Sequence, residues 1–369
     1  MSSVLLGIAA LTQADPETER TWKVTSPPPT TAPDYSAYTQ SYHIPFAPYG
    51  KNKVLPDFDK LAGMNVRVSI NGGEPMTLQV DTGSWGIVVG DLDVPNIDPN
   101  SPEGSLIYSS SGNQFYGKWT MATVTFPDSK DEHGNVATAV VPVLAADTYK
   151  HVPGAVNDSK KGYTQSAHPR PRMFGIGSGR GKENNQFRNP WVNLKEMQAG
   201  TMRRGYTITR DGITLGLTGK GVGDGYVFEK LKEHVGQPTT WPAVEPRPKD
   251  WDSPTGYVVV DGKKQETMWT LLDTGLTNMM IEVPQMHGQA TVPDGTPIEV
   301  HLLGGRLMYE FKVGDKNNPA TPSKVTWVHY DSPPMINTGL RALAHFDYLY
   351  DADGGYFGLR PTRPATTQP

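Results

Sequence analysis

The stretch Val80-Asp81-Thr82-Gly83 recurs as Leu272-Asp273-Thr274-Gly275, 192 positions further along a chain of 369 residues. Each copy follows an apolar segment that predicts a strand and precedes a second apolar run. These flanking segments are 76–80 and 87–89 for the first copy, and 268–272 and 279–281 for the second. A single Asp-Thr-Gly is an ordinary turn sequence. Its repetition in matched apolar surroundings predicts two equivalent turns, one in each half of the chain.

The repeated aspartates suggest a specific chemistry. An aspartate at the end of a buried strand, followed by Thr-Gly, is expected on a tight turn where the glycine lets other backbone approach closely. If the two turns meet, Asp81 and Asp273 lie within about 3 Å of each other and share one proton. The ionised carboxyl can then take a proton from water while the protonated one donates to a substrate carbonyl. This is general acid–base attack of water on an amide, without a metal or a covalent intermediate.

Beyond the two turns, residues 60–362 resemble the pepsin-like aspartic endopeptidases. The stretches that carry the resemblance are the opening hairpin 66–90, the flap-like Ile107–Gly112, Met173-Phe174-Gly175, the short helix 191–197, and Ile336–Gly339 with 348–351. The resemblance implies a mainly β, bilobal acid-protease fold with a few short helices and a cleft between the lobes. It implies an aspartic endopeptidase that hydrolyses internal bonds of a peptide or protein bound in that cleft, with large apolar side chains on either side of the scissile bond and no cofactor.

The resemblance also assigns roles to residues of this chain. The catalytic pair is Asp81 and Asp273. The substrate-binding residues are Gly83, Gly275, Tyr108 and Ser109, with Tyr108 placed on the flap. The residues that support the pair are Thr82, Ser84, Thr274 and Thr277. Plain structural roles remain alternatives for Tyr108, as a strand tyrosine, and for Ser84, as a turn serine.

Two departures from the family pattern concern this site. Leu276 stands where the family has Ser or Thr, so Asp273 lacks one donor unless Thr277 or water replaces it. Because losing a donor raises the pKa of a carboxyl, we expect a pH optimum less acidic than that of pepsin. In the family, a tryptophan that follows the first turn partners the flap tyrosine. This chain has Trp85-Gly86 and then an apolar run at that place, so Tyr108 is expected to lack its usual partner.

These departures keep an alternative function open. The chain can be a weakly active or inactive binding or inhibitor protein that uses the same cleft for recognition only. The retention of both aspartates favours the enzyme. A carbohydrate-binding protein that uses the eight tryptophans as stacking platforms leaves the repeated turns unexplained.

Composition excludes several other classes. The absence of cysteine excludes disulfides, thiolate nucleophiles and iron–sulfur clusters. The net charge of −4 argues against a nucleic-acid-binding surface. No apolar run approaches the roughly 18 residues of a membrane span, and the nine histidines show no metal-ligand spacing. We expect a monomer without a metal.

The predicted organisation has three parts. Residues 1–50 form an N-terminal arm, 51–200 a lobe with the first turn, and 201–369 a lobe with the second. The apolar stretch 4–11, followed by Thr12-Gln13-Ala14, has the shape of a signal peptide but no preceding Lys or Arg. It is therefore either a leader, which would make the protein secreted or periplasmic, or an element packed on the body. The Pro/Thr-rich stretch 26–33 is expected to be extended, as part of a linker or a strap over the surface.

The remaining secondary structure is read from periodicity and turn residues. We expect strands at 65–70, 76–80, 119–126, 136–144, 206–217, 257–260, 268–272 and 324–329. We expect short helices at 190–197, 227–234 and 340–346. The glycine-rich segment 175–181 lacks the spacing of a phosphate-binding loop and is predicted to be a mobile loop.

Overall fold

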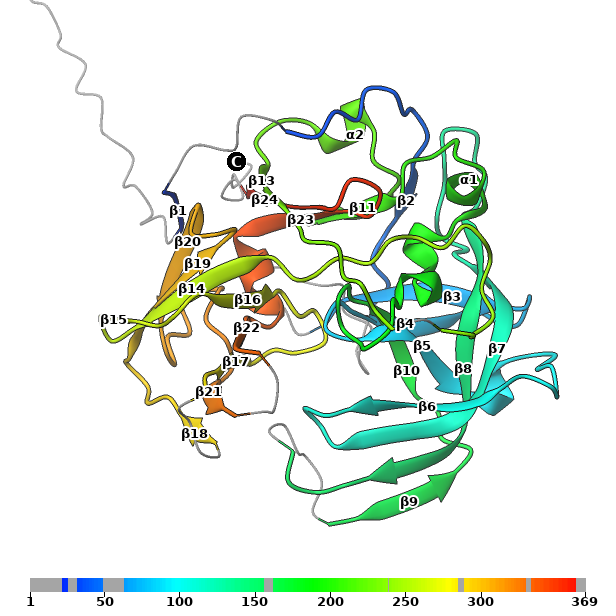
Figure 1. Cartoon of the computed structure of the whole chain (residues 1–369), viewed down its shortest axis with the longest axis horizontal. Coiled ribbons are helices and arrows are strands. Elements are labelled where there is room, and N and C mark those ends of the chain that lie inside the picture. Colours follow the sequence, from blue (N-terminus) through cyan, green and yellow to red (C-terminus); the bar gives the residue numbers. More distant parts are fainter. Residues whose placement is uncertain are drawn as a thin grey trace, which may run out of the picture.

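The computed structural model describes residues 22–25, 32–48, 63–155, 162–237, 239–284, 289–329 and 333–362. The candidate leader at 4–14 and most of the Pro/Thr-rich stretch lie outside these residues. The described chain is mainly β, as predicted, and its strands form three sheets (Figure 1). No helix among the described residues is long and apolar enough to cross a membrane.

The first sheet contains the first Asp-Thr-Gly turn. Its eight strands run in the order β6-β7-β3-β4-β10-β5-β8-β9. They are β3 (Asn65–Ile70), β4 (Met76–Asp81), β5 (Trp85–Gly90), β6 (Glu103–Tyr108), β7 (Asn113–Thr125), β8 (Thr138–His151), β9 (Thr164–Ala167) and β10 (Arg172–Ile176). Strand β4 ends at Asp81, and the turn leads directly into β5.

The second sheet contains the second turn. Its main path is β1-β20-β19-β14-β16-β22-β17-β21-β18, and β15 pairs with β14. The strands are β1 (Trp22–Val24), β14 (Thr255–Val260), β15 (Lys263–Lys264), β16 (Met268–Leu271), β17 (Met279–Glu282), β18 (Ala290–Thr291), β19 (Pro297–Leu302), β20 (Leu307–Lys312), β21 (Val325–Val328) and β22 (Met335–Asn337). The turn connects β16 to β17.

A six-stranded sheet lies along a third side, at the top of the view in Figure 1. Its order is β13-β24-β23-β11-β12-β2, with β2 (Tyr42–Ile44), β11 (Gly205–Thr209), β12 (Gly212–Leu215), β13 (Val227–Lys230), β23 (Phe346–Asp351) and β24 (Tyr356–Pro361). The helical elements are α1 (Lys195–Gln198), α2 (Gly219–Val222) and 3-10 helices at Asp91–Asp93, Gln186–Arg188, Pro190–Val192 and Leu340–Ala344.

The two Asp-Thr-Gly turns have the same strand environment. In the first sheet, β10 lies between β4 and β5, parallel to β4 and antiparallel to β5, with Gly175 opposite Asp81. In the second sheet, β22 lies in the same way between β16 and β17, with Asn337 opposite Leu271. Most apolar residues of these central strands are buried, as strands covered on both faces require. This repeated arrangement places the two turns equivalently.

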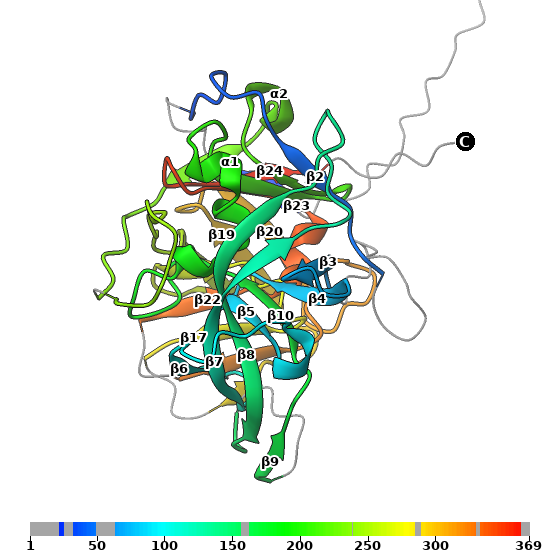
Figure 2. The same ribbon diagram turned by 90° about the vertical axis from the view of Figure 1, so that its right-hand side faces the viewer.

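The N-terminal arm contributes an edge strand to each of two sheets. Strand β1 pairs with β20 of the ten-stranded sheet, and β2 pairs with β12 of the six-stranded sheet. Figure 2 shows β2 running beside the strands of the six-stranded sheet. Two short segments of the arm therefore lie on the body as edge strands. The assignment of whole lobes to 51–200 and 201–369 remains a prediction.

Two local predictions were wrong. Residues 206–217, predicted as one strand, form the hairpin β11–β12, because the chain reverses at Arg210-Asp211, between the paired residues Thr209 and Gly212. Residues 227–234, predicted as a helix, begin with strand β13, whose Val227 and Phe228 are buried against β24. Pairing along a sheet edge outweighs the weak helical periodicity of this segment.

Candidate active site

The two turns bring Asp81 and Asp273 together. Each of these residues is only 5% exposed. A Cβ added at Gly83 would lie 2.3 Å from Oδ2 of Asp273, and one added at Gly275 would lie 2.6 Å from Cγ of Asp81. Each carboxyl thus rests against the glycine of the opposite turn, and both carboxyls line the same cleft.

The threonines bind the two turns to each other. The backbone N–H of Thr82 donates to Oγ1 of Thr274 at 3.0 Å, and the N–H of Thr274 donates to Oγ1 of Thr82 at 3.0 Å. The two hydroxyls in turn donate to carbonyls before the opposite turn, Thr274 to Val80 and Thr82 to Leu272. All of these groups are buried, so the network fixes the relative position of the two aspartates.

Asp81 is held by its own turn. Its Oδ1 accepts the backbone N–H groups of Gly83, at 2.8 Å, and Ser84, at 3.1 Å. Its Oδ2 accepts the hydroxyl of Ser84 at 2.6 Å. These three hydrogen bonds fix the orientation of the Asp81 carboxyl.

Asp273 has a different set of partners. Its Oδ1 accepts the N–H of Gly275 at 2.9 Å, and its Oδ2 accepts the side-chain amide of Asn337 at 2.7 Å. Thr277 does not supply the missing donor, because its hydroxyl pairs with the hydroxyl of Ser323 at 3.1 Å. No role for Asn337 follows from the sequence. The signal that could have found it is a buried amide in the strand expected to run beside the second turn.

The electrostatics of the pair are asymmetric. Burial, and then the charge of Asp81, raise the pKa of Asp273 to about 7, although the amide of Asn337 and the N–H of Gly275 act in the opposite direction. Asp273 is therefore a carboxyl that keeps its proton well above the ordinary pKa of an aspartate. The pair therefore keeps one shared proton up to near-neutral pH.

The role of Asn337 can be tested through the pH profile. Replacing Asn337 by Ala removes one donor to the ionised form of Asp273, which raises its pKa further. A hydrogen bond worth about 0.5–1.5 kcal/mol corresponds to an upward shift of about 0.5–1 pH unit in the basic limb of the kcat/KM profile for peptide hydrolysis. Thr277→Ala is the matched control and should leave that limb in place. An equal shift in both variants, or a shift only in the control, contradicts this assignment.

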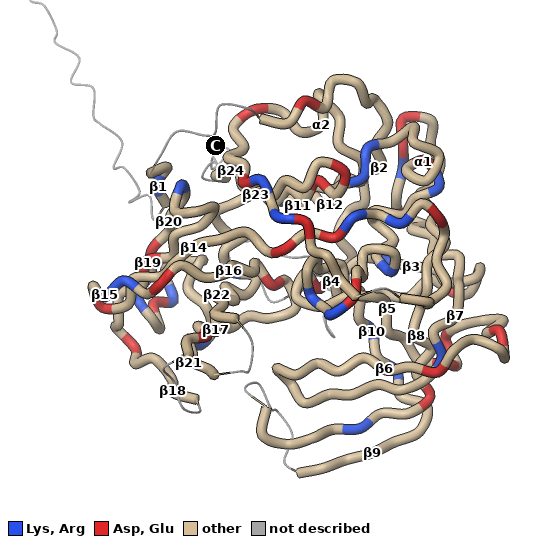
Figure 3. The backbone as a smooth tube through the Cα atoms, viewed as in Figure 1, with Lys and Arg blue, Asp and Glu red and all other residues tan. Residues whose placement is uncertain are grey.

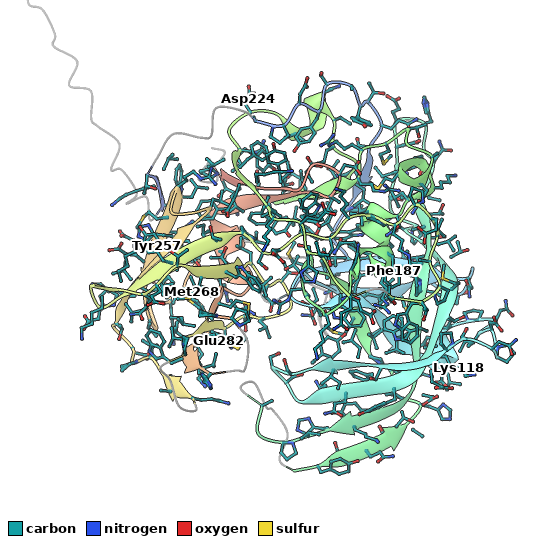
Figure 4. All side chains as sticks on the ribbon, viewed as in Figure 1. Lys118, Phe187, Asp224, Tyr257, Met268 and Glu282 are labelled. Carbon is teal, nitrogen blue, oxygen red and sulfur yellow. The ribbon has the colours of Figure 1, made fainter. Side chains whose placement is uncertain are left out.

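A cleft of about 650 Å³ opens above the two aspartates. Its walls come from both large sheets and from the hairpin of β6 and β7, whose tip includes Tyr108 and Ser109. The first sheet provides apolar side chains such as Leu106 and Phe115, and the second provides Met280 and Met335. Glu282, the last residue of β17, also lines this cleft and is labelled in Figure 4. The cleft therefore combines apolar walls with polar and charged groups. The tip of the hairpin that borders it carries no Lys, Arg, Asp or Glu (Figure 3).

Tyr108 is the last residue of β6 and lies at the tip of the hairpin, opposite Asn113 of β7. Burial, and then the charge of Asp81, raise its pKa well above the ordinary value, while nearby Ser84 acts in the opposite direction. Its ring meets Phe115 edge to face, with the ring centroids 6.0 Å apart. It packs on an apolar cluster that also includes Trp119 and is flanked by Trp85. Tyr108 thus has aromatic neighbours despite the changed sequence after Ser84.

A buried arginine supports this aromatic cluster from behind. The guanidinium of Arg188 lies 4.7 Å from the ring centroids of both Trp85 and Trp119, which are themselves stacked. Phe187, labelled in Figure 4, contacts the same guanidinium at 4.4 Å. Since cation–π contacts strengthen when they are desolvated, this arrangement should hold Trp85, and with it the end of the first turn, in place.

The fold and the paired aspartates define an aspartyl-peptidase-like protein. The chain belongs to the family described as the PE-PGRS C-terminal aspartyl peptidase-like domain, whose family model matches residues 57–345. That range includes both turns, the hairpin over the cleft and Asn337. A comparison with curated proteins finds no match to this chain. Among the residues that the structure describes, no three His, Asp or Glu side chains are grouped to hold a metal ion.

Proposed function

We propose that this chain is an aspartic endopeptidase of the pepsin-like type, with Asp81 and Asp273 as its catalytic pair. The observation that carries the proposal is the contact of two buried carboxyls, one from each large sheet, at the floor of a cleft. The raised pKa of Asp273 supports it, since a pair that shares one proton contains both an acid and a base.

The contacts suggest which carboxyl acts as the base and which as the acid. The ionised Asp81 takes a proton from the water that attacks the carbonyl carbon of the scissile amide. The protonated Asp273 donates its proton to the carbonyl oxygen, and the tetrahedral intermediate that forms is uncharged at that oxygen. Breakdown requires a proton on the amide nitrogen, which the proton gained by Asp81 supplies. As the C–N bond breaks, Asp273 takes back a proton from one hydroxyl of the gem-diol, which leaves a carboxylic acid and an amine. The pair is then in its starting state of protonation.

The surroundings favour an extended peptide as the substrate. The cleft runs between the two sheets under the hairpin, where Tyr108 and Ser109 can close over a bound chain. The glycines of the two turns leave room for substrate backbone near the carboxyls, because any side chain there would collide with them. Apolar walls formed by residues such as Leu106 and Met280 suit large apolar side chains next to the scissile bond. Secretion and a monomeric state remain predictions from the sequence.

The proposal is tested by digesting a peptide library with the full chain between pH 3 and pH 8. We expect internal cleavage that a statine-type transition-state inhibitor blocks. We also expect activity to persist to near-neutral pH and to fall as pH rises through about 7, because the shared proton is then lost. Tight binding of the inhibitor without any cleavage would favour the recognition protein. Cleavage that the inhibitor does not affect would reject the aspartic mechanism.

A further inference from the structure

The glycine-rich segment 175–181 is anchored to the active site and is not a free loop. It leaves the end of β10 and passes directly behind the first turn, where the N–H of Gly177 donates to the carbonyl of Ser84 at 2.7 Å. A Cβ added at Gly177 would lie 2.5 Å from the carbonyl oxygen of Thr82. The side chain of Gln186 donates to the carbonyl of Gly177 at 2.9 Å. The prediction of a mobile loop therefore missed these fixed contacts.

A second set of contacts holds the far side of the segment. Asp250, which is 1% exposed, accepts the N–H groups of Gly179 at 2.8 Å and Asn185 at 3.2 Å. The imidazole of His234 lies 3.0 Å from the carbonyl oxygen of Gly181 and 2.8 Å from the carboxylate of Asp252. The residues on both sides of position 180 are thus tied to the segment 232–252, which fixes where the side chain of that residue points.

The side chain presented in this way is Arg180, which lines the cleft beside the two aspartates. Its Nε donates to the carbonyl of Gly83 at 3.0 Å, and its Nη1 lies 3.5 Å from Sδ of Met335. The guanidinium therefore reaches from the first turn to the second sheet. An arginine has five N–H donors, and among the described residues only one of those of Arg180 meets an oxygen.

Arg180 and Arg172, the two arginines that line the cleft, differ in whether their charge is paired with a carboxylate. Arg172 donates to Oδ2 of Asp93 at 2.6 Å, so its charge is already paired. Arg180 makes no ion pair with any carboxylate of the described residues. The acidic groups that share the cleft are the pair Asp81 and Asp273 and, on β17, Glu282. Arg180 is thus a fixed cation, with unused donors, next to the reacting atoms.

We propose that Arg180 determines substrate specificity by binding an acidic side chain of the peptide, Asp or Glu, within two positions of the scissile bond. Two N–H groups of a guanidinium match the two oxygens of a carboxylate, and charge-assisted pairs of this kind are strong and directional. The inference rests on the proposed function, since it names the substrate class for the same cleft. An acidic side chain on one side of the bond would accompany apolar side chains elsewhere in the cleft.

Matched peptides test the proposal through cleavage. Each pair differs only by Asp or Asn at one of the four positions that flank the cleaved bond, and kcat/KM is measured at pH 6. We expect one position at which the wild-type chain prefers Asp about tenfold or more. Arg180→Gln should bring that ratio to about one, Arg180→Lys should retain part of it, and Arg172→Gln should keep it. No preference in the wild type, or a preference that survives Arg180→Gln, overturns the inference.

Binding separates this inference from the proposed function. Non-cleavable statine peptides that carry Asp or Asn at each of the same positions are titrated calorimetrically into the full chain and into Arg180→Gln. If no peptide is cleaved but the wild type binds the Asp form about tenfold more tightly and the variant does not, the proposed catalysis fails and the role of Arg180 stands. Equal affinity for both forms in the wild type rejects the role of Arg180 whether or not cleavage occurs. Thermal unfolding checks that each variant is folded.

Discussion

Asp81→Asn and Asp273→Asn should each lower kcat/KM for peptide hydrolysis by about 10²–10⁴-fold, the range expected when a positioned acid or base is removed. An amide is nearly isosteric with a carboxyl but can neither take a proton from water nor release one to a carbonyl. Asn at position 81 removes the base, and Asn at position 273 removes the acid. The measurement is steady-state hydrolysis of a peptide found in the library digest.

The control for this experiment is Asp128→Asn. Asp128 pairs with Arg67 at the surface and does not line the cleft. The kcat/KM of Asp128→Asn should therefore match that of the wild type. Cleavage that survives substitution of Asp81 or Asp273 at an undiminished rate points to a contaminant or to another site. It would refute the catalytic role of the pair.

The Asp273→Asn variant also has a distinct stability signature. The pKa of Asp273 is raised above that of an unfolded aspartate, so the folded state holds its proton more tightly. The stability that this carboxyl contributes is present below about pH 4 and is lost as the pH rises through about 7. The melting temperature of the wild type should therefore fall more between pH 4 and pH 8 than that of Asp273→Asn. This comparison also shows whether the inactive variant is folded.

The second large effect is expected for Gly83→Ala and Gly275→Ala. A methyl group at either position would lie less than 3 Å from the opposite carboxyl, and neither carboxyl can retreat without breaking its hydrogen bonds. The substitution therefore separates the two aspartates or displaces a turn. Because misplacement by about 1 Å can cost about 10²-fold in rate, we expect a loss of at least that size in kcat/KM.

Gly200→Ala is the matched control for a glycine substitution. Gly200 has a φ of 75°, and an added Cβ would meet nothing within 4 Å. Alanine there costs about 1–2 kcal/mol in backbone strain, measured by denaturant unfolding, and should leave kcat/KM unchanged. If Gly83→Ala and Gly275→Ala were as active as this control, the close packing of the carboxyls against the turns would be refuted.

Much of the candidate site was predictable because it is built from local sequence. In the first turn, Asp81 receives its donors from residues two and three positions further on, Gly83 and Ser84. Such contacts follow from the conformation of a short turn and need no distant partner. The strands before and after each turn were also predictable, since 76–80 alternates apolar and polar residues and 87–89 and 279–281 are apolar runs. The segment 227–234 is short and lies at a sheet edge, and there periodicity alone wrongly predicted a helix in place of strand β13.

Local residue types encode turns and strands, so two equivalent acidic turns, each between apolar strands, can be predicted from the order of residues. Which distant side chains reach these turns depends on how the chain packs. Asn337 meets Asp273, and Thr277 does not, because β22 lies parallel to β16 in a register that ends at Leu271 and Asn337. Arg180 reaches the cleft because Asp250 fixes the loop before and after it. Such contacts depend on strand register and on loops packed from far along the chain, which no local pattern specifies.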